Sequence, residues 1–597
     1  MSGPGSSKVS RRRFLRMAGI ATGAVILAGC GGEKPTSGPP PTVKPTSAPV
    51  AEATSAPTLE ATPAVAECKM DWNPTTPPFD KYSPEVEIAV PFESGQEFAY
   101  ETDSFTNSPM YNRIVELLGI RYTVAWEAPR AEYYRRLNTD LAAGTLPDAF
   151  RCKNSALATF IDPGAVEDIT ELWDAVGSDL AKAKKGYPDG PIWRDVRRDG
   201  RVFGIAYLED GYGSDSLTYI RQDWLDKLGL KAPSTLDEMT QVAREFKKAG
   251  LCEFPIAICS YLVTWDFGVD PVFGAFGVVP AGYDPGYWLK GDDGKLRYSS
   301  LEPGAREALA VLNTWYKEEL INPDFVNQDE SGPNDAFMAG QVGIAFQPPG
   351  GSRWNVPDLY SAFPEAKIAI IPNPAGPTGK RGRAGTPLNG NAVLFRKGVD
   401  PIKIEALIKH INWQIEMHVN FEKYQQYGEY LNGAAFFKGY EWDFDEQCNM
   451  VPGKTPGGGE WSTVRNLVGA YRGATYPDYV IDCYKPMATW FDMDPSQLNM
   501  AQRFIISDPT ARREIEYYNI AFSTRDEIIP NAFQGPRTPA INEVLTDLLD
   551  YERTAFLEFI TGSRPLDAFE AFCQEWLDRG GQVFTDEVNK WAAEKAV

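Results

Sequence analysis

The sequence predicts an α/β fold whose sheets are mostly parallel, and an alternation of strands and helices carries this prediction. Val86–Val90 and Arg121–Trp126 have the apolar pattern of strands, and Tyr111–Leu118 between them has the pattern of a helix. Crossover connections between such strands are right-handed, which favours parallel pairing. At 597 residues the chain is long enough for two or more domains with cores of their own.

The next elements continue the alternation. Tyr134, Leu137 and Leu141 recur at helical spacing, and Leu146–Phe150 begins a third strand. The residues that follow, 151–155, emerge at the carboxyl end of that strand, where open α/β sheets bind ligands. These residues are therefore candidates for ligand contact.

A capped helix is predicted after a strand that ends at Tyr219 and Ile220. Asp223–Gly229 reads as a short helix closed by glycine, and Thr235 with Glu238 has the spacing of a capping box. The apolar face of the helix that follows consists of Leu236, Met239, Val242, Ala243 and Phe246.

Further elements are predicted toward the C-terminus. A helix is expected over 305–319, and a loop over Gln347–Trp354. A last helix has Phe569, Phe572, Cys573 and Trp576 on its apolar face.

Three motifs resemble those of a known family: IRQDWLDKLGLKAPSTLDE from Ile220, LAAGTLPDAF from Leu141 and ITGSRPLDAF from Ile560. They are similar to motifs of the extracellular solute-binding protein family 1, in its branch of LplA-like lipoproteins that serve sugar ABC importers. The likeness covers residues 84–597 and is weaker between 430 and 530.

The resemblance implies a two-lobed, type II periplasmic-binding-protein-like fold with a hinge between the lobes. The first lobe would comprise residues 84–210 and 385–480, and the second residues 215–380 and 485–597. Leu208–Ser216 would be the first crossing between them, and fits either a hinge that bears ligand contacts or a plain surface loop.

The N-terminus predicts export and lipidation. Ser10–Arg16 matches a twin-arginine signal, and Leu27–Cys30 resembles a bacterial lipobox, so residues 1–29 are expected to be a signal peptide. Residues 30–83 would hold a lipidated Cys30 and a disordered tether rich in Pro, Thr, Ser and Ala. The protein is expected on the extracytoplasmic face of the cell membrane.

Composition argues against several functions. A net charge of −22 disfavours nucleic acid as a partner. His410 and His418, the two histidines, lie ~12 Å apart if they share a helix, too far to share one metal ion. No GxSxG, HExxH or phosphate-loop motif occurs.

Metal ions, cofactors and disulfides receive no positive assignment. The segment Lys248–Pro255 lacks the acidic calcium-binding loop that many relatives carry, so no metal or other cofactor is expected. Seven cysteines follow Cys30, an odd number, and their pairing cannot be deduced from the spacing.

A carbohydrate site needs aromatic rings for stacking and planar polar side chains for hydroxyl groups. The resemblance places nine such residues at loops facing an interlobe cleft: Arg151, Lys153, Asn154, Glu209, Asp210, Tyr212, Trp265, Arg353 and Trp354. Arg353 and Trp354 could instead pack over a neighbouring helix. The expected partners are an oligosaccharide or monosaccharide and the permease subunits of an importer, and the protein is expected to be a monomer.

Two alternatives stay open from the sequence. A secreted glycoside hydrolase or polysaccharide lyase could use a carboxylate pair such as Asp443 and Asp445, or Asp492 and Asp494. Such pairs lie two residues apart, so on a strand they share one face and do not oppose each other across a substrate. The same cleft could also bind a peptide or another non-sugar solute.

Overall fold

The computed structural model describes the chain from residue 68 to residue 595, with gaps. The described ranges are 68–71, 75–94, 100–129, 132–153, 156–208, 216–264, 266–280, 286–384, 390–424, 430–431, 434–435, 438–440, 442–453, 485–535 and 537–595. The predicted signal peptide, Cys30 and the tether up to residue 67 lie outside these ranges, whereas residues 68–71 and 75–83, which the prediction assigned to the tether, are described. No helix among the described residues is long and apolar enough to cross a membrane.

The first lobe is built around one hydrophobic core, formed by residues from 86–207 and 392–424. Strand β1 (Val86–Ser94) pairs in parallel with β2 (Ile120–Pro129). A separate sheet has the order β3-β13-β6, from Ala149–Cys152, Gly390–Phe395 and Ile205–Leu208. The helices of the first lobe are α2 (Pro109–Leu118), α3 (Tyr133–Ala143), α4 (Leu157–Ile161), α5 (Thr170–Val176), α6 (Asp179–Lys184), α13 (Pro401–Val419) and α14 (Phe421–Tyr424).

The second lobe is built on a sheet with cores on both faces. The strand order is β12-β7-β11-β8, from Ile368–Ile371, Leu217–Arg221, Ile344–Gln347 and Ile256–Ala257. Because side chains alternate along a strand, Ile220 and Ile344 enter one core, and Tyr219 and Ala345 enter the other. We call these the second and third cores.

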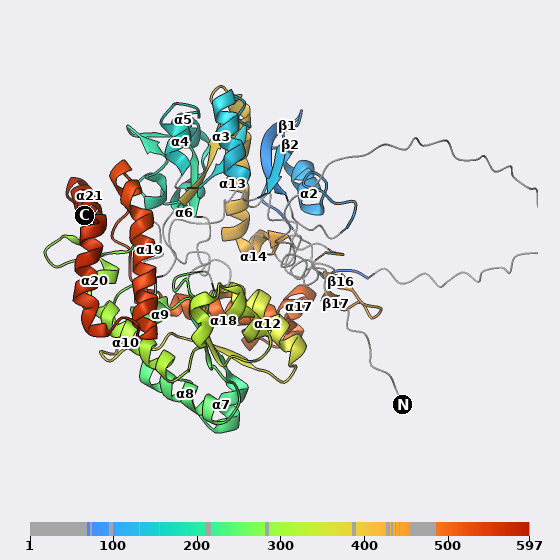
Figure 1. The fold of residues 1–597 in the computed structure, drawn as a ribbon. Coiled ribbons are helices and arrows are strands. Elements are labelled where there is room, and N and C mark those ends of the chain that lie inside the picture. The colour runs from blue at the N-terminus through green and yellow to red at the C-terminus, as the bar shows by residue number, and fades with distance from the viewer. Residues whose placement is uncertain are drawn as a thin grey trace, which may run out of the picture. The chain divides into compact units, whose positions relative to one another are not determined.

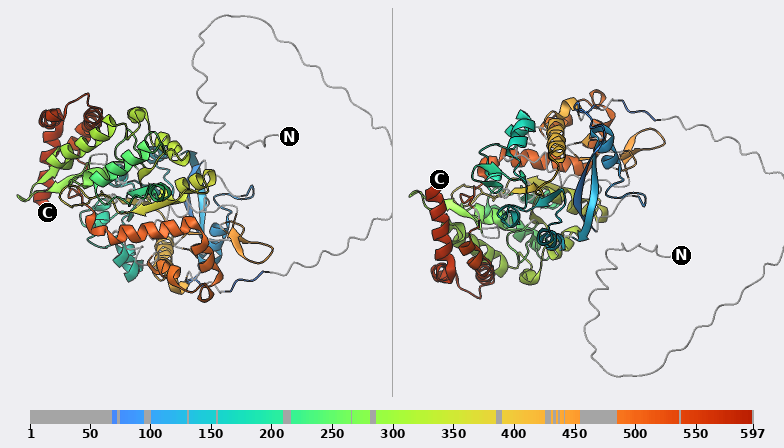
Figure 2. Two further views of the ribbon diagram at one scale, coloured as in Figure 1. Left: turned by 90° about the horizontal axis from the view of Figure 1, so that it is seen from below. Right: turned by 90° about the horizontal axis from the view of Figure 1, so that it is seen from above.

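Helices cover the two faces of this sheet (Figure 1). The second core receives α8 (Leu236–Lys248), α10 (Pro303–Lys317), α19 (Pro539–Thr561), α20 (Phe569–Trp576) and α21 (Gln582–Lys595). The third core receives α11 (Ser331–Met338), α12 (Gly350–Ala362), α16 (Lys485–Thr489), α17 (Met500–Ser507) and α18 (Pro509–Ser523). The C-terminal helices α20 and α21 lie far from β1 and β2 in both turned views (Figure 2).

Smaller elements complete the described part. They are β4 (Arg197–Arg198), β5 (Arg201–Val202), α7 (Gln222–Leu228), α9 (Asp270–Gly274), β9 (Trp288–Lys290), β10 (Leu296–Tyr298), β14 (Tyr430–Leu431), β15 (Ala434–Ala435), β16 (Trp442–Phe444) and β17 (Met450–Pro452). Trp442 and Met450 belong to the third core, although their segment was assigned to the first lobe. The exact lobe limits stay a prediction.

The prediction of mostly parallel sheets is wrong for the central strands. β13 runs antiparallel to β3 and β6, and β7 runs antiparallel to β11 and β12; parallel pairing joins only β1 to β2 and β8 to β11 among the described strands. The reason is that β7 and β13 each enter their lobe from the other one. A strand that arrives by crossing starts at the edge where the local strands end, so it runs in the opposite direction.

The capped helix is confirmed, with one change at its start. The Thr235 side chain accepts a hydrogen bond from the Glu238 backbone N–H at 3.2 Å, as predicted. The Glu238 carboxylate, however, accepts from the backbone and hydroxyl of Ser234, both at 2.7 Å, and not from Thr235. All five residues predicted for the apolar face are buried.

One disulfide is present among the described cysteines, between Cys68 and Cys448. Cys152, Cys252, Cys259 and Cys573 are free thiols. No group of three or more His, Cys, Asp or Glu side chains that could hold a metal ion occurs in the described ranges.

Candidate functional site

The carboxyl ends of the local strands of each lobe point to the edge at which the chain crosses between lobes. In the first lobe these strands are β3 and β6, and in the second they are β8, β11 and β12. Ligands bind at this edge in open α/β sheets. Two groups of polar side chains lie there, and we describe each in turn.

The first-lobe group is centred on Arg151, near the end of β3. Its guanidinium forms an ion pair with Glu93 of β1, and both side chains are largely buried. The guanidinium carbon lies 5.9 Å from the ring centre of Tyr133, within the range of a cation–π contact. Burial opposes the charge of Arg151, but Tyr207 and Glu93 raise its pKa above the ordinary value. The arginine is thus a fixed, charged donor beside aromatic rings.

Lys153 and Asn391 lie at the same edge of the first lobe. The Lys153 ammonium lies 4.6 Å from the ring centre of Tyr134, and its backbone N–H donates to the Tyr134 hydroxyl at 2.8 Å. Asn391 stands opposite Tyr207 in the β13–β6 pairing, and its buried Nδ2 has no hydrogen-bond partner in the described part of the chain.

The second-lobe group consists of Asp266, Gln347 and Asn355. Gln347 ends β11 and is fully buried; its Oε1 accepts a hydrogen bond from Asn355 Nδ2 at 3.2 Å. Burial, together with the charge of Glu330, raises the pKa of Asp266 to about 7, although a hydrogen bond with Asn355 opposes the shift. Asn355 therefore links the other two side chains.

Two buried atoms of this group have no hydrogen-bond partner among the described residues: Asp266 Oδ1 and Gln347 Nε2. One is an acceptor and the other a donor. An unpaired buried polar group costs the folded state about 1–3 kcal/mol, so each one calls for an explanation, such as a ligand or an ordered water that supplies the missing partner. A ligand hydroxyl can both donate and accept, which matches this pair.

The predicted site residues divide into three sets. Arg151, in β3, and Lys153, just after it, lie at the crossing edge. Asn154, Glu209, Asp210, Tyr212 and Trp265 lie outside the described residues. The backbone of Arg353 and Trp354 lies in α12, so the loop predicted up to Trp354 is wrong because the helix already begins at Gly350; the side chains of both residues are outside the description.

The sequence did not single out Glu93, Tyr133, Tyr207, Asp266 or Gln347. Glu93 and Gln347 end strands, and Asp266 follows Trp265 directly. The usable signal was therefore position: a polar residue at the carboxyl end of a strand is a candidate whatever its type.

Two other polar groups hold the fold together. The Asp148 carboxylate, from the motif LAAGTLPDAF, accepts from Arg396 at 3.0 Å, from Lys403 at 2.6 Å and from the Ala89 backbone at 3.0 Å. His410 is fully buried, its Nδ1 lies 2.7 Å from the Tyr122 hydroxyl, and burial lowers its pKa to about 3. A neutral, enclosed imidazole is structural.

Comparison with known proteins agrees with this arrangement. The family described as "Bacterial extracellular solute-binding protein" matches residues 121–408. Residues 121–408 therefore belong to this family. The match spans β2 to α13, so this solute-binding region contains the central sheet strands of both lobes and both described polar groups except Glu93.

Two relatives extend the similarity. The fructooligosaccharide ABC transporter substrate-binding protein FusA of Streptococcus pneumoniae is 22% identical over 49% of this chain and 56% of its own length. The polygalacturonan/rhamnogalacturonan-binding protein YtcQ of Bacillus subtilis is 25% identical over 79% of this chain and 86% of its own length. The chain thus aligns with little more than half of FusA and with most of YtcQ.

A solved structure confirms the fold. FusA of S. pneumoniae in complex with kestose matches with a TM-score of 0.58 and 15% identity, over 86% of this chain and 99% of that one. The predicted two-lobed α/β fold of the type II periplasmic binding proteins is confirmed by this match. At such low identity the likeness extends to the fold alone.

Proposed function

We propose that the chain is the substrate-binding protein of a carbohydrate ABC importer and that it captures an oligosaccharide or a monosaccharide between its lobes. The observation that carries the proposal is an acceptor and a donor at the crossing edge, Asp266 Oδ1 and Gln347 Nε2, that have no hydrogen-bond partner among the described residues. Sugar hydroxyls supply both partners. Closure of the lobes around the ligand would bring the two polar groups onto it.

The first-lobe group fits the same ligand class. Arg151 is a charged donor held in place by Glu93, and Tyr134, which is partly exposed and packs against the buried ring of Tyr133, offers a ring near it. Rings stack on the apolar faces of sugars, and fixed polar groups select among hydroxyl positions. The names of FusA and YtcQ both refer to carbohydrates, which favours a sugar over a peptide as the ligand.

The carboxylate pairs that suggested a hydrolase or lyase, Asp443 with Asp445 and Asp492 with Asp494, fit a binding protein better than an enzyme. Asp445 accepts from the backbone of Gln447 at 2.9 Å and of Asn449 at 2.8 Å, so it holds a turn. Asp494 accepts from the Ser496 backbone at 2.9 Å and caps a short helix. Carboxylates occupied in this way are poorly suited to act as a pair on a glycosidic bond.

The cellular setting belongs to the same proposal. The chain would be exported by the twin-arginine route, lipidated at Cys30, held at the outer face of the membrane and active as a monomer beside its permease. A Cys30→Ala variant should move from the membrane fraction to the soluble fraction, because a stable anchor requires the acyl chains. Retention of that variant in the membrane would contradict the lipid anchor.

The ligand is tested by thermal shift with the full-length protein in detergent, against neutral and acidic oligosaccharides and against peptides. A ligand at 100 times its Kd adds ~2.7 kcal/mol, or about 2–3 °C for a folded body of this size. Chromatography of each sugar afterwards shows whether it was cleaved.

Matched variants connect the shift to the site. Arg151→Gln should weaken sugar binding at least tenfold, because a charge-assisted hydrogen bond contributes ~1.5–3 kcal/mol. The same change at exposed Lys231 should leave binding unaltered. Cleaved sugar, or shifts with peptides alone, would overturn the proposal.

A further inference from the structure

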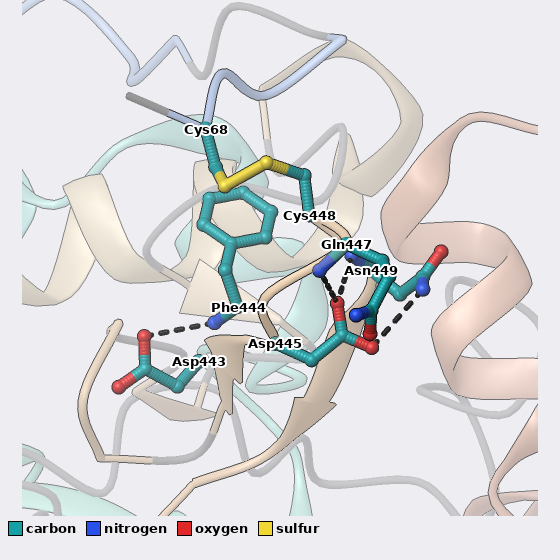
Figure 3. The surroundings of a disulfide bond; sticks show 7 residues. All are labelled: Cys68, Asp443, Phe444, Asp445, Gln447, Cys448 and Asn449. Atoms are coloured by element: carbon teal, nitrogen blue, oxygen red, sulfur yellow. Dashed lines mark hydrogen bonds between the residues drawn. A yellow bond between two sulfur atoms is a disulfide. The ribbon is translucent and has the colours of Figure 1, made fainter. Parts of the chain in front are cut away.

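The N-terminal segment of the folded body contacts both lobes. We call residues 68–71 and 75–82 the strap. Its first residue, Cys68, forms the disulfide with Cys448, across 380 positions of sequence and with 5.3 Å between the Cα atoms (Figure 3). Cys448 lies in the turn between β16 and β17.

That turn belongs to the second lobe. Trp442 of β16 and Met450 of β17 are buried in the third core, together with Leu217 and Tyr219 of the sheet. Asp445 fixes the turn through its hydrogen bonds to Gln447 and Asn449, shown in Figure 3. The disulfide therefore attaches the strap to a rigid part of the second lobe.

A second contact on the same lobe follows three residues later. The two carboxylate oxygens of Asp71 each accept from the Met500 backbone N–H at 3.0 Å, at the start of α17, and Arg503 lies 3.4 Å away. Ala501 and Ile505 of α17 are buried in the third core.

The other end of the strap is held by the first lobe. Trp413 of α13 donates its indole N–H to the Pro77 carbonyl at 3.1 Å, and the Tyr82 hydroxyl donates to Glu405 at 3.2 Å. Phe79 and Tyr82 pack against the first core. The chain then enters β1, so this end cannot move independently of the first lobe.

Two further hydrogen bonds join loop 100–107 of the first lobe to the residues just before β16. The Tyr100 hydroxyl donates to the Gly439 carbonyl at 2.6 Å, and the Tyr440 hydroxyl donates to Asp103 at 3.1 Å. Phe105 of this loop stacks on Phe92 of β1, with ring centres 4.6 Å apart. The segment just before the β16–β17 hairpin is thus hydrogen-bonded to the first lobe, while the hairpin itself packs in the third core of the second lobe.

We propose that the strap, closed by the Cys68–Cys448 disulfide, is a covalent clasp that limits how far the two lobes separate and thereby strengthens ligand binding. Lobes that close around a ligand lose conformational freedom, and this loss opposes binding. A clasp that already restricts the open state reduces the loss. The effect on affinity rests on the binding function proposed above, whereas the effect on lobe separation does not.

The test compares three forms of the full-length protein in detergent: wild type, Cys68→Ser/Cys448→Ser, and the control Cys252→Ser/Cys573→Ser. The control carries the same two changes at free thiols. Small-angle X-ray scattering measures the radius of gyration with and without sugar, with the detergent matched out. Calorimetry measures Kd for the sugar found in the thermal-shift screen.

We expect the ligand-free clasp variant to be larger than wild type, the ligand-bound forms to agree, and Kd to rise about fivefold or more. The control should match wild type in each respect. Equal dimensions and equal Kd in all three forms would overturn the clasp. If wild type binds no sugar, the proposed function fails, and the ligand-free dimensions alone decide whether the clasp exists.

Failure of the serine variant to fold would not end the test. Wild type that has been folded and then treated with TCEP loses the disulfide after folding, and circular dichroism verifies that its helices persist. Expansion of this reduced protein without loss of helix supports the clasp. An unchanged radius of gyration after complete reduction contradicts it.

Discussion

Lys185 offers a sharp test of how burial affects this protein. It lies at the C-terminal end of α6 and is fully buried, and its ammonium donates to the Ala206 carbonyl of β6 at 3.0 Å. Burial lowers the pKa of Lys185 from 10.5 to about 7. Burial is the cause of this shift, and no carboxylate of the described residues offsets the desolvation of the lysine.

The sign of the pH dependence follows from the direction of the shift. Between pH 7 and 10.5 the unfolded chain keeps the Lys185 proton while the native protein has released it, so stability rises with pH in this range. The slope is at most ~1.4 kcal/mol per pH unit. Near pH 7 the buried lysine lowers the free energy of unfolding by about 4 kcal/mol, and near pH 8.5 by about 3 kcal/mol.

We therefore expect Lys185→Met to raise the melting temperature, and to do so most at low pH. A folded body of roughly 530 residues has an unfolding entropy of about 1.1 kcal/mol per kelvin, so removal of the burial cost alone would raise the melting temperature by about 4 °C at pH 7, and the net gain should be about 3 °C. Loss of the hydrogen bond to Ala206 subtracts about 1 kcal/mol at every pH. Scanning calorimetry at pH 6.5, 7.5 and 8.5 measures both effects.

The same substitution at exposed Lys231 serves as the control, with no expected change in melting temperature. The decisive quantity is the difference between variant and wild type as a function of pH. It should shrink by about 1.5 °C between pH 7 and 8.5. A difference that stays constant, or a variant that is less stable throughout, would refute the assignment of the shift to burial.

Three further outcomes are expected from the same measurement. Asp266→Asn should stabilise the ligand-free protein by an amount that grows between pH 4 and 7. Burial raises the pKa of Asp266 to about 7, so over this range the folded protein binds a proton that the unfolded chain releases, and the wild type loses stability as the pH rises. Asp547→Asn, at an exposed position, should show no such trend. Thr235→Ala should lower stability by ~1 kcal/mol and Thr235→Ser should restore it, because the hydroxyl caps α8. Gly274→Ala should cost roughly 1–3 kcal/mol, since its Cβ would lie 2.0 Å from the Gly382 carbonyl oxygen. An unchanged melting temperature would show that the end of α9 and the segment around Gly382 move apart easily.

Local signals made the elements predictable. The helix from Leu236 follows from an N-cap threonine and an apolar face at helical spacing, and both features depend on residues within one or two turns. Arg151 and Lys153 could be placed at the crossing edge because they lie in and just after the last residues of a recognisable strand.

Features that depend on distant residues could not be read in this way. Cys68 and Cys448 are 380 positions apart, and nothing in either neighbourhood identifies the partner. The antiparallel direction of β7 and β13 depends on which lobe the chain has just left. Asp266 and Gln347 stand out as candidates only because they are buried, and the packing of α12 and of the loop after β8 determines that burial.

The crossing topology also explains why two of the buried polar groups that destabilise the fold lie at the crossing edge. Each local strand ends at the crossing edge, so the residues after it cannot be paired by continuing the sheet. In the second lobe, burial raises the pKa of Asp266, and Gln347 Nε2 at the end of β11 has no hydrogen-bond partner in the described part of the chain, at a combined cost of several kcal/mol to the ligand-free state. A ligand that satisfies both groups recovers part of that cost on binding. The same groups should therefore lower the stability of the free protein and raise its affinity for hydroxyl-rich ligands, so that Asp266→Asn should stabilise the free protein at neutral pH and weaken its ligand binding.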